Sequence, residues 1–273
     1  MCLSPSEIME QYALASKKKA SLSCGTVLGK SILAGMMIGM GAACSSVAAH
    51  AIDNIGLARF VSGLVFPVGL MMVILMGAEL FTGDCLMAVG VCDKKISFFQ
   101  LIKTLILVYV GNFIGSILLS GLVFFSGQLD YSNARLGAYT IKIAYGKLML
   151  NPQQQLASGI LCNILVCLAV LMAMAAKDVT GKLLSCFFVI MVFVIGGFEH
   201  CVANMYYITA GIMAQWNPAY VDAAANIYGL TNISNVDIGN MLVGNLFLVT
   251  VGNIIGGALC VGIPMYFLTK NKK

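Results

Sequence analysis

The chain of 273 residues contains six long apolar stretches, at about 28–50, 60–91, 98–126, 155–176, 183–214 and 239–268. A helix needs only about 20 apolar residues to cross a bilayer, so each stretch is long enough to span one. Charged residues make up 10% of the chain, against about 25% in an ordinary soluble domain. The sequence therefore predicts an all-α integral membrane protein, with six transmembrane helices in a single domain over residues 1–273.

The two halves of the chain repeat one another. Three pairs of segments match in the same order, the longest being VYVGNFIG against VTVGNIIG: 108–115 with 249–256, 31–33 with 159–161, and 77–79 with 197–199. Each half holds three spans, an odd number, so the second half is inverted relative to the first. We therefore expect two inverted three-helix repeats, 28–126 and 155–268, an arrangement typical of transport proteins.

The second and fifth apolar stretches are longer than a span requires, and polar residues interrupt each of them. The interruptions read GAELFTGDC at 77–85 and GGFEHCVAN at 196–204. Irregular backbone at membrane depth is tolerated only where protein buries it or water reaches it, so we expect two broken helices beside a solute path. Ionisable groups at this depth are functional candidates, and we assign His200 to the path. Glu79 and Glu199 are partners in the repeat, so we expect both to serve the structure of the helix ends.

The distribution of positive charge predicts the orientation. With both termini in the cytoplasm, four basic residues face outward (Arg59, Arg135, Lys142 and Lys147), and the other twelve lie on the cytoplasmic side. This bias satisfies the positive-inside rule for a multi-pass protein of the inner (cytoplasmic) membrane. The net charge of +5 is then a result of topology, and we expect no nucleic-acid partner. The cytoplasmic cations are Lys17, Lys18, Lys19, Lys30, Lys94, Lys95, Lys103, Lys177, Lys182, Lys270, Lys272 and Lys273.

The first 27 residues predict an amphipathic helix on the cytoplasmic surface. Ser4, Pro5 and Glu7 follow the pattern of a capping box, and Ile8 and Tyr12 then share one face. The ten cysteines include no C-x-x-C pair, which indicates small hydrophobic residues and argues against metal ligands or disulfides. The sequence has no cofactor motif and no nucleophile–base pair, so we expect neither a cofactor nor an enzyme.

Four segments of the chain resemble the formate–nitrite transporter family: GAELFTG (77–83), GILCNILVCLAV (159–170), GFEHCVANM (197–205) and VGNIIGG (251–257). The resemblance implies an aquaporin-like protomer with two broken helices. It also implies a homopentamer in the lipid bilayer, in which each protomer carries its own pore. Members of the family conduct small monovalent anions such as formate, nitrite and hydrosulfide, so these anions and protons are the expected partners.

The resemblance also assigns two constrictions. It implies that Phe66, Leu70 and Phe193 form the constriction on the cytoplasmic side, and that Leu80 forms the outer one. All four are ordinary membrane residues, and from the residues alone each would more often pack against a helix or lipid.

The polar residues of the pore follow from the same resemblance. Thr82 matches a loop threonine that can hydrogen-bond the pore histidine, which is His200. Asn163 and Asn253 match pore amides, and Lys147 matches a basic residue that draws anions to the pore. The residues themselves leave other interpretations open, because an amide inside a span can bridge helices and an exposed cation can simply position the chain at the interface.

The sequence leaves the solute and the mode of transport open. The first loop reads Phe-Thr-Gly-Asp-Cys where formate channels read Phe-Thr-Ser-Thr, and this departure favours hydrosulfide. A bare anion faces a large desolvation cost in an apolar constriction; the neutral acid avoids that cost, and His200 could stabilise the anion or lend it a proton. One alternative is a proton-coupled secondary transporter for formate or nitrite. Another is an aquaporin-like facilitator of neutral solutes, but the Asn-Pro-Ala motif of that family occurs once, at 217–219, where it predicts a turn.

Overall fold

The computed structural model describes residues 2–270, which form helices and no strand within that range. Lys272 and Lys273, two of the predicted cytoplasmic cations, lie outside the described residues. Six helical segments of the described chain are long and apolar enough to cross a membrane, which confirms the predicted membrane fold. They are α2 (Cys24–Ala49), α3 (Ile55–Val65) with α4 (Val68–Met76), α7 (Phe98–Phe125), α9 (Pro152–Ala175), α10 (Val179–Gly196), and a last segment of η3 (Asn240–Leu246), α13 (Phe247–Ile254), η4 (Ile255–Gly262) and α14 (Ile263–Thr269).

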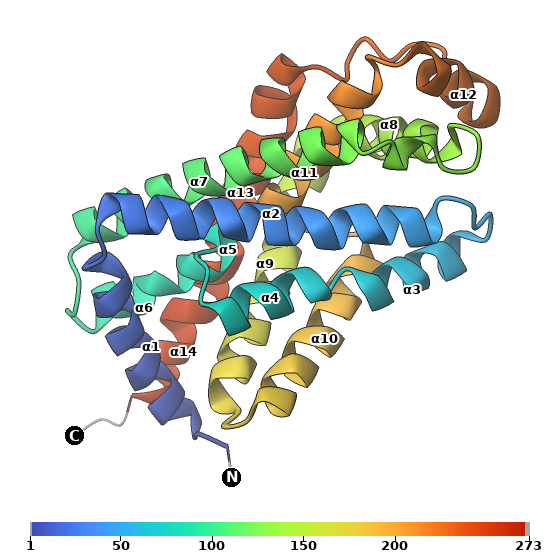
Figure 1. Ribbon diagram of the computed structural model, residues 1–273. Coiled ribbons are helices and arrows are strands. Elements are labelled where there is room, and N and C mark those ends of the chain that lie inside the picture. The colour runs from blue at the N-terminus through green and yellow to red at the C-terminus, as the bar shows by residue number, and fades with distance from the viewer. Residues whose placement is uncertain (1, 271–273) are drawn as a thin grey trace.

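Shorter helices complete the chain: α1 (Pro5–Ala20), α5 (Phe81–Asp84), η1 (Cys85–Met87), α6 (Ala88–Cys92), η2 (Gln128–Asp130), α8 (Arg135–Leu148), α11 (Cys201–Ala214) and α12 (Pro218–Tyr228). Both chain termini lie at one end of the molecule with α1, α6 and α14, which we call the terminal end (Figure 1). The opposite end, the far end, holds α8, α12 and the start of α3. The single Asn-Pro-Ala motif, predicted to be a turn, lies where the chain turns from α11 into α12, and Asn217 caps the second helix.

Both predicted helix breaks are present, and they have the same backbone geometry. α4 ends at Gly77 (φ 64°) and α10 ends at Gly197 (φ 68°), each in the left-handed conformation. Glycine adopts this conformation without steric cost, which explains why a glycine begins each interruption. The chain then becomes extended at Leu80 and His200, and a new helix starts at the next residue.

One buried asparagine satisfies the backbone of the first break. The Asn112 side chain on α7 donates to the carbonyl oxygens of Ser31 (2.8 Å) and Glu79 (3.0 Å), and its own oxygen accepts from the Phe81 amide (2.9 Å). Backbone groups released by a helix break need such partners, because unpaired ones are costly away from water.

The second break uses the same device in the second half. Asn253 on α13 donates to the carbonyl oxygens of Gly159 (2.8 Å) and Glu199 (3.0 Å), and it accepts from the Cys201 amide (2.9 Å). Asn112 and Asn253 are the asparagines of the longest repeated segment. That repeat therefore reflects a shared structural role: each asparagine clamps one helix break by bonding to its backbone.

The correspondence between the halves extends to α1 and α8, which lie outside the predicted repeats. Each carries a lysine twelve residues before the first matched segment of its half. Lys19 of α1 pairs with Glu79 in the first break (Nζ–Oε2 2.6 Å), and Lys147 of α8 pairs with Glu199 in the second (Nζ–Oε1 2.8 Å). Each break is therefore tied by an ion pair to the helix that precedes its half.

Helix α1 packs on the protein at the terminal end. The capping box of Ser4 and Glu7 is present, as the sequence predicts. The buried face of the helix includes Met9 and Tyr12, and the Tyr12 hydroxyl donates to the carbonyl oxygen of Gly83 in the first break (2.9 Å). The apolar face of α1 is thus covered by the protein itself.

Candidate functional site

A hydrogen bond joins the two breaks in the interior of the molecule. It links Thr82 Oγ1 on α5 with Nε2 of His200, the residue that caps α11 (2.9 Å). The other ring nitrogen, Nδ1, accepts from the Ala203 amide (3.1 Å). A backbone N–H can only donate, so Nδ1 carries no proton, and the ring is the neutral tautomer that donates from Nε2 to Thr82. Thr82 is itself fully buried and lines neither the vestibule nor the small cavity, so its hydroxyl orients the ring of His200, which lines both.

Apolar side chains surround this hydrogen bond. His200 lines a small cavity of about 10 Å³ with Phe66, Leu70, Leu80 and Phe193, and Ile38, Val166 and Ile190 complete its wall. A cavity of this size holds about one water molecule. A solute at this point therefore exchanges its hydration shell for a few protein contacts.

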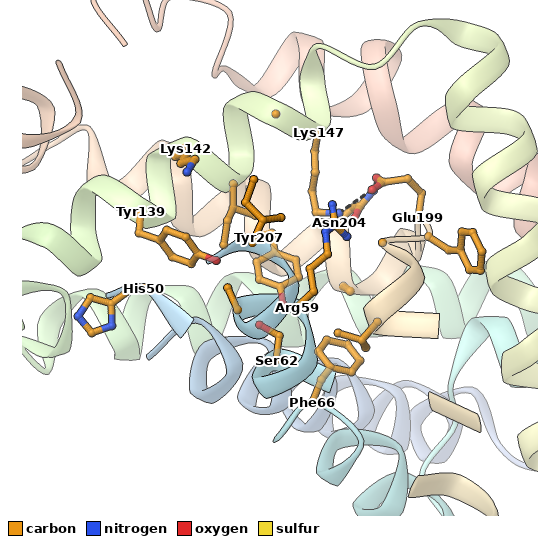
Figure 2. A pocket seen from close by; sticks show the side chains of 18 of the residues that line it. His50, Arg59, Ser62, Phe66, Tyr139, Lys142, Lys147, Glu199, Asn204 and Tyr207 are labelled. Atoms are coloured by element: carbon orange, nitrogen blue, oxygen red, sulfur yellow. Dashed lines mark hydrogen bonds and ion pairs between the residues drawn. The ribbon is translucent and has the colours of Figure 1, made fainter. Parts of the chain in front are cut away.

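A pocket of about 600 Å³ opens from this point toward the far end (Figure 2). We call it the far-end vestibule; its walls come from α3, α8, α10 and α11, and Phe66, Phe193 and His200 lie at its inner end. The Phe66 and Phe193 rings meet edge to face, with 5.5 Å between their centroids.

The predicted sides of the constrictions do not agree with the predicted cytoplasmic location of the termini. Phe66 and Phe193, expected on the cytoplasmic side, line the far-end vestibule, whereas Leu80, expected on the outer side, lines only the small cavity beyond them with Leu70. The cause is the direction of the chain. Helix α3 starts at the far end, so Phe66 precedes Leu70 on the way inward, and α10 reaches Phe193 only in its last turn.

Lys147 is not the exposed outer cation that the sequence suggested. Its side chain is only 15% exposed and is paired with Glu199. The second Glu199 oxygen accepts from Asn204 (2.6 Å), which also donates to Asn245 (2.8 Å), and Asn245 donates back to the Lys147 carbonyl oxygen (3.0 Å). This closed network fixes the lysine in the vestibule wall and gives Glu199 the structural role that we expected.

The two predicted pore amides lie behind the breaks. Asn163 and Asn253 are fully buried and line neither the vestibule nor the small cavity. Asn163 donates to the carbonyl oxygens of Thr82 (3.1 Å) and Asn253 (2.7 Å). The bridging interpretation therefore describes these amides, because backbone carbonyls of neighbouring segments occupy their donors.

Sequence reasoning missed the role of Lys19 at the terminal end. Lys19 contacts both Glu79 and Asp84, and Lys30 lies 3.8 Å from Glu79. Asp84 follows the first glutamate by five residues, as Asn204 follows Glu199. The sequence held one signal of this role: Lys19 and Lys147 each lie twelve residues before the first matched segment of their half. No group of His, Cys, Asp and Glu in residues 2–270 is arranged to hold a metal ion.

Comparison with known proteins gives one family over nearly the whole chain. The formate/nitrite transporter family matches residues 6–267. The formate channel FocA of Haemophilus influenzae is 38% identical over 79% of this chain and 76% of that protein. A probable formate transporter of Methanothermobacter thermautotrophicus is 34% identical over 99% of this chain and 98% of that protein.

Solved structures with the same fold give the same result. A pentameric formate channel with formate bound superposes with a TM-score of 0.79 and 31% identity, over 90% of this chain and 97% of that one. An ion channel of the FNT family superposes with a TM-score of 0.83 and 26% identity, over 97% and 99% of the two chains. The chain described here belongs to the formate/nitrite transporter family.

Proposed function

We propose that this protein is a passive pore for small monovalent anions, and that the solute crosses the apolar constriction as its neutral acid. The observation that carries the proposal is a cavity of about 10 Å³ between apolar side chains, in which His200, held by its hydrogen bond with Thr82, is the one polar residue of the lining. An anion without water or a counter-charge would face a large desolvation cost there, whereas a neutral acid needs only hydrogen bonds.

The hydrogen bonds of His200 argue that the proton comes from water. A neutral imidazole that donates from Nε2 has no second proton to give. A doubly protonated ring would lose the bond from the Ala203 amide at the start of α11. Thr82 therefore holds the His200 ring in place, and the solute meets this ring at the cavity wall.

Formate is the first solute to test. The sequence favoured hydrosulfide because Gly83 and Asp84 depart from the formate-channel loop. In the structure Asp84 contacts Lys19, so a contact with α1 accounts for the aspartate. Nothing around Gly83 requires a glycine, because a Cβ atom there would meet only Val170, at 3.5 Å. Relatives of this chain are named formate channels, and hydrosulfide becomes the second arm of the same assay.

Each copy of the chain would hold a complete pore. We expect five such pores, one in each copy, in a homopentamer like that of the solved pentameric relative. The distribution of lysines supports an inner-membrane location, with the terminal end in the cytoplasm.

Uptake into proteoliposomes tests the proposal. Formate, nitrite, hydrosulfide and chloride are compared in one preparation, with empty liposomes and the variant Thr82→Val as controls. We expect uptake of the three anions that have weak neutral acids, a rise in uptake as the pH falls, and exclusion of chloride. Chloride uptake equal to that of formate would contradict the neutral-acid route. Accumulation with a fixed proton stoichiometry would establish the proton-coupled transporter instead.

A further inference from the structure

Two of the four basic side chains in the far-end vestibule are neutralised by carboxylates. Arg135 is paired with Asp53 (Nη2–Oδ1 2.7 Å) and Lys147 with Glu199 (2.8 Å). These cations already have anionic partners, so they offer little to an incoming solute.

The other two cations have no carboxylate partner among the residues that the structure describes. The ammonium group of Lys142 lies over the ring of Tyr228, 4.3 Å from its centroid, and a cation–π contact of this kind satisfies part of its charge. Arg59 has neither an ion pair nor a hydrogen bond within residues 2–270, although it lines the vestibule. A guanidinium group has five donors, and those of Arg59 are available.

The second helix break provides the space that holds the Arg59 side chain. Figure 2 shows this side chain extending from α3 into the vestibule. A Cβ atom on Gly197 would lie 2.1 Å from Arg59 Nη1 and 3.2 Å from Nη2, so the guanidinium packs directly against the glycine of the break. Gly197 therefore has two reasons to be glycine: its left-handed backbone and the contact with Arg59.

The position of Arg59 on α3 connects it with the constriction. Ser62 and Phe66 follow it at spacings of three and seven residues, on the same helical face, and all three line the vestibule (Figure 2). A solute leaving the guanidinium moves along this face to Phe66 and then to His200.

We propose that Arg59 is the docking residue for planar oxyanions, and that it gives the pore a preference for formate and nitrite over hydrosulfide and chloride. Formate and nitrite each present two oxygens in one plane, which match the parallel N–H donors of a guanidinium. Hydrosulfide and chloride have a single acceptor atom and gain only the charge attraction. The inference rests on the proposed function and names the solute class that the same pore selects.

Lysine at this position separates geometry from charge. Arg59→Lys keeps the positive charge but loses the forked donors, and Arg59→Gln loses both. Arg135→Lys is the matched control, because it makes the same exchange at a vestibule cation whose charge is already paired with Asp53 through Nη2. The measurement is the half-saturating concentration of formate and of hydrosulfide for uptake by proteoliposomes, with gel filtration in detergent to verify assembly.

We expect Arg59→Lys to raise the half-saturating concentration of formate by about two- to fivefold, the range of a partly exposed ion pair, and to leave that of hydrosulfide unchanged. Arg135→Lys should leave the ratio between the two solutes as in the wild type. Equal shifts for both solutes, or no shift for formate in Arg59→Lys, would overturn the docking role.

A second measurement tests the docking site when no uptake can be detected. Sodium formate should raise the melting temperature of the detergent-solubilised wild type above that in equal sodium chloride, because a ligand stabilises the state that binds it. The difference should vanish in Arg59→Lys and persist in Arg135→Lys. A wild type that is inert to uptake but stabilised by formate would refute the proposed function alone, whereas an equal effect of both salts would refute the docking site.

Discussion

Replacing Asn253 with alanine tests whether this residue is a structural clamp or a pore amide. The substitution removes one acceptor and two donors that serve the backbone at Gly159, Glu199 and Cys201, all within 3.0 Å. A buried backbone group left without a partner costs about 1–3 kcal/mol. The Gly159 carbonyl lies inside α9 and keeps its helical hydrogen bond, so two groups, the Glu199 carbonyl and the Cys201 amide, lose their partner. Asn253→Ala should therefore lower the free energy of unfolding by about 2–6 kcal/mol.

Two matched variants calibrate this prediction. Asn112→Ala should cost the same, because its three hydrogen bonds are 2.9, 2.8 and 3.0 Å long, like those of Asn253. Asn54→Ala removes only an exposed helix cap with one bond to the Leu57 amide, and such a cap is worth about 1 kcal/mol. Unfolding by SDS titration of the detergent-solubilised protein measures all three.

A pore amide would behave in the opposite way. Asn253→Ala would then unfold like Asn54→Ala, and formate uptake or anion selectivity would change in a protein of normal stability. That result would refute the clamp and restore the role that the family resemblance assigned.

Three further outcomes are expected. His200→Asn should keep the cap of α11, because asparagine caps helices well, but its shorter side chain cannot make the hydrogen bond to Thr82. Formate uptake should fall with little change in melting temperature, and unaltered uptake from pH 5 to 8 would contradict this. Lys147→Gln leaves the buried Glu199 carboxylate without its partner, at a cost of about 3–5 kcal/mol. The free energy of unfolding should fall at every salt concentration and recover in a double variant with Glu199→Gln. A loss of formate uptake that high salt abolishes would instead indicate that Lys147 attracts anions. Phe193→Ile should raise conductance at the constriction, and reduced melting with wild-type uptake would show that this ring only packs.

The fold could be predicted because its signals are local. Apolar runs of sufficient length give the spans, and Gly77 and Gly197 reveal the breaks because a left-handed turn at a helix end selects glycine. The repeated Val-Gly-Asn segment predicted the inverted halves, and the partners of Asn112 and Asn253 now supply the physical reason for it.

The site could be predicted only in part, because its contacts join residues far apart in the chain. The Thr82–His200 hydrogen bond was expected from the family resemblance, but the sequence gives no sign that Nδ1 of the histidine is occupied by a backbone amide. Lys19 and its carboxylate partners are separated by 60 residues or more in the sequence. From the sequence alone, Lys19 therefore resembled its neighbours Lys17 and Lys18, which we expected to be solvent-exposed. The family resemblance assigned Phe66 to the cytoplasmic side, whereas the residue lines the vestibule at the end opposite the termini (Figure 1), because the direction of α3 sets its depth.

Asp84 and Asn204 occupy matching positions in the two helix breaks but differ in charge. In the first break Asp84 adds a second carboxylate beside Lys19. Asn204, in the wall of the far-end vestibule, is a neutral amide. Arg59 and Lys142 line the same vestibule and have no carboxylate partner within residues 2–270. Lys19 and Lys30 are therefore balanced by Glu79 and Asp84 around the first break, whereas the far-end vestibule keeps an excess of positive charge. A pore of this kind behaves as a weak diode for anions: at equal concentrations on both sides, its current–voltage curve bends. Added salt straightens the curve as the Debye length falls from about 30 Å at 0.01 M to about 8 Å at 0.15 M.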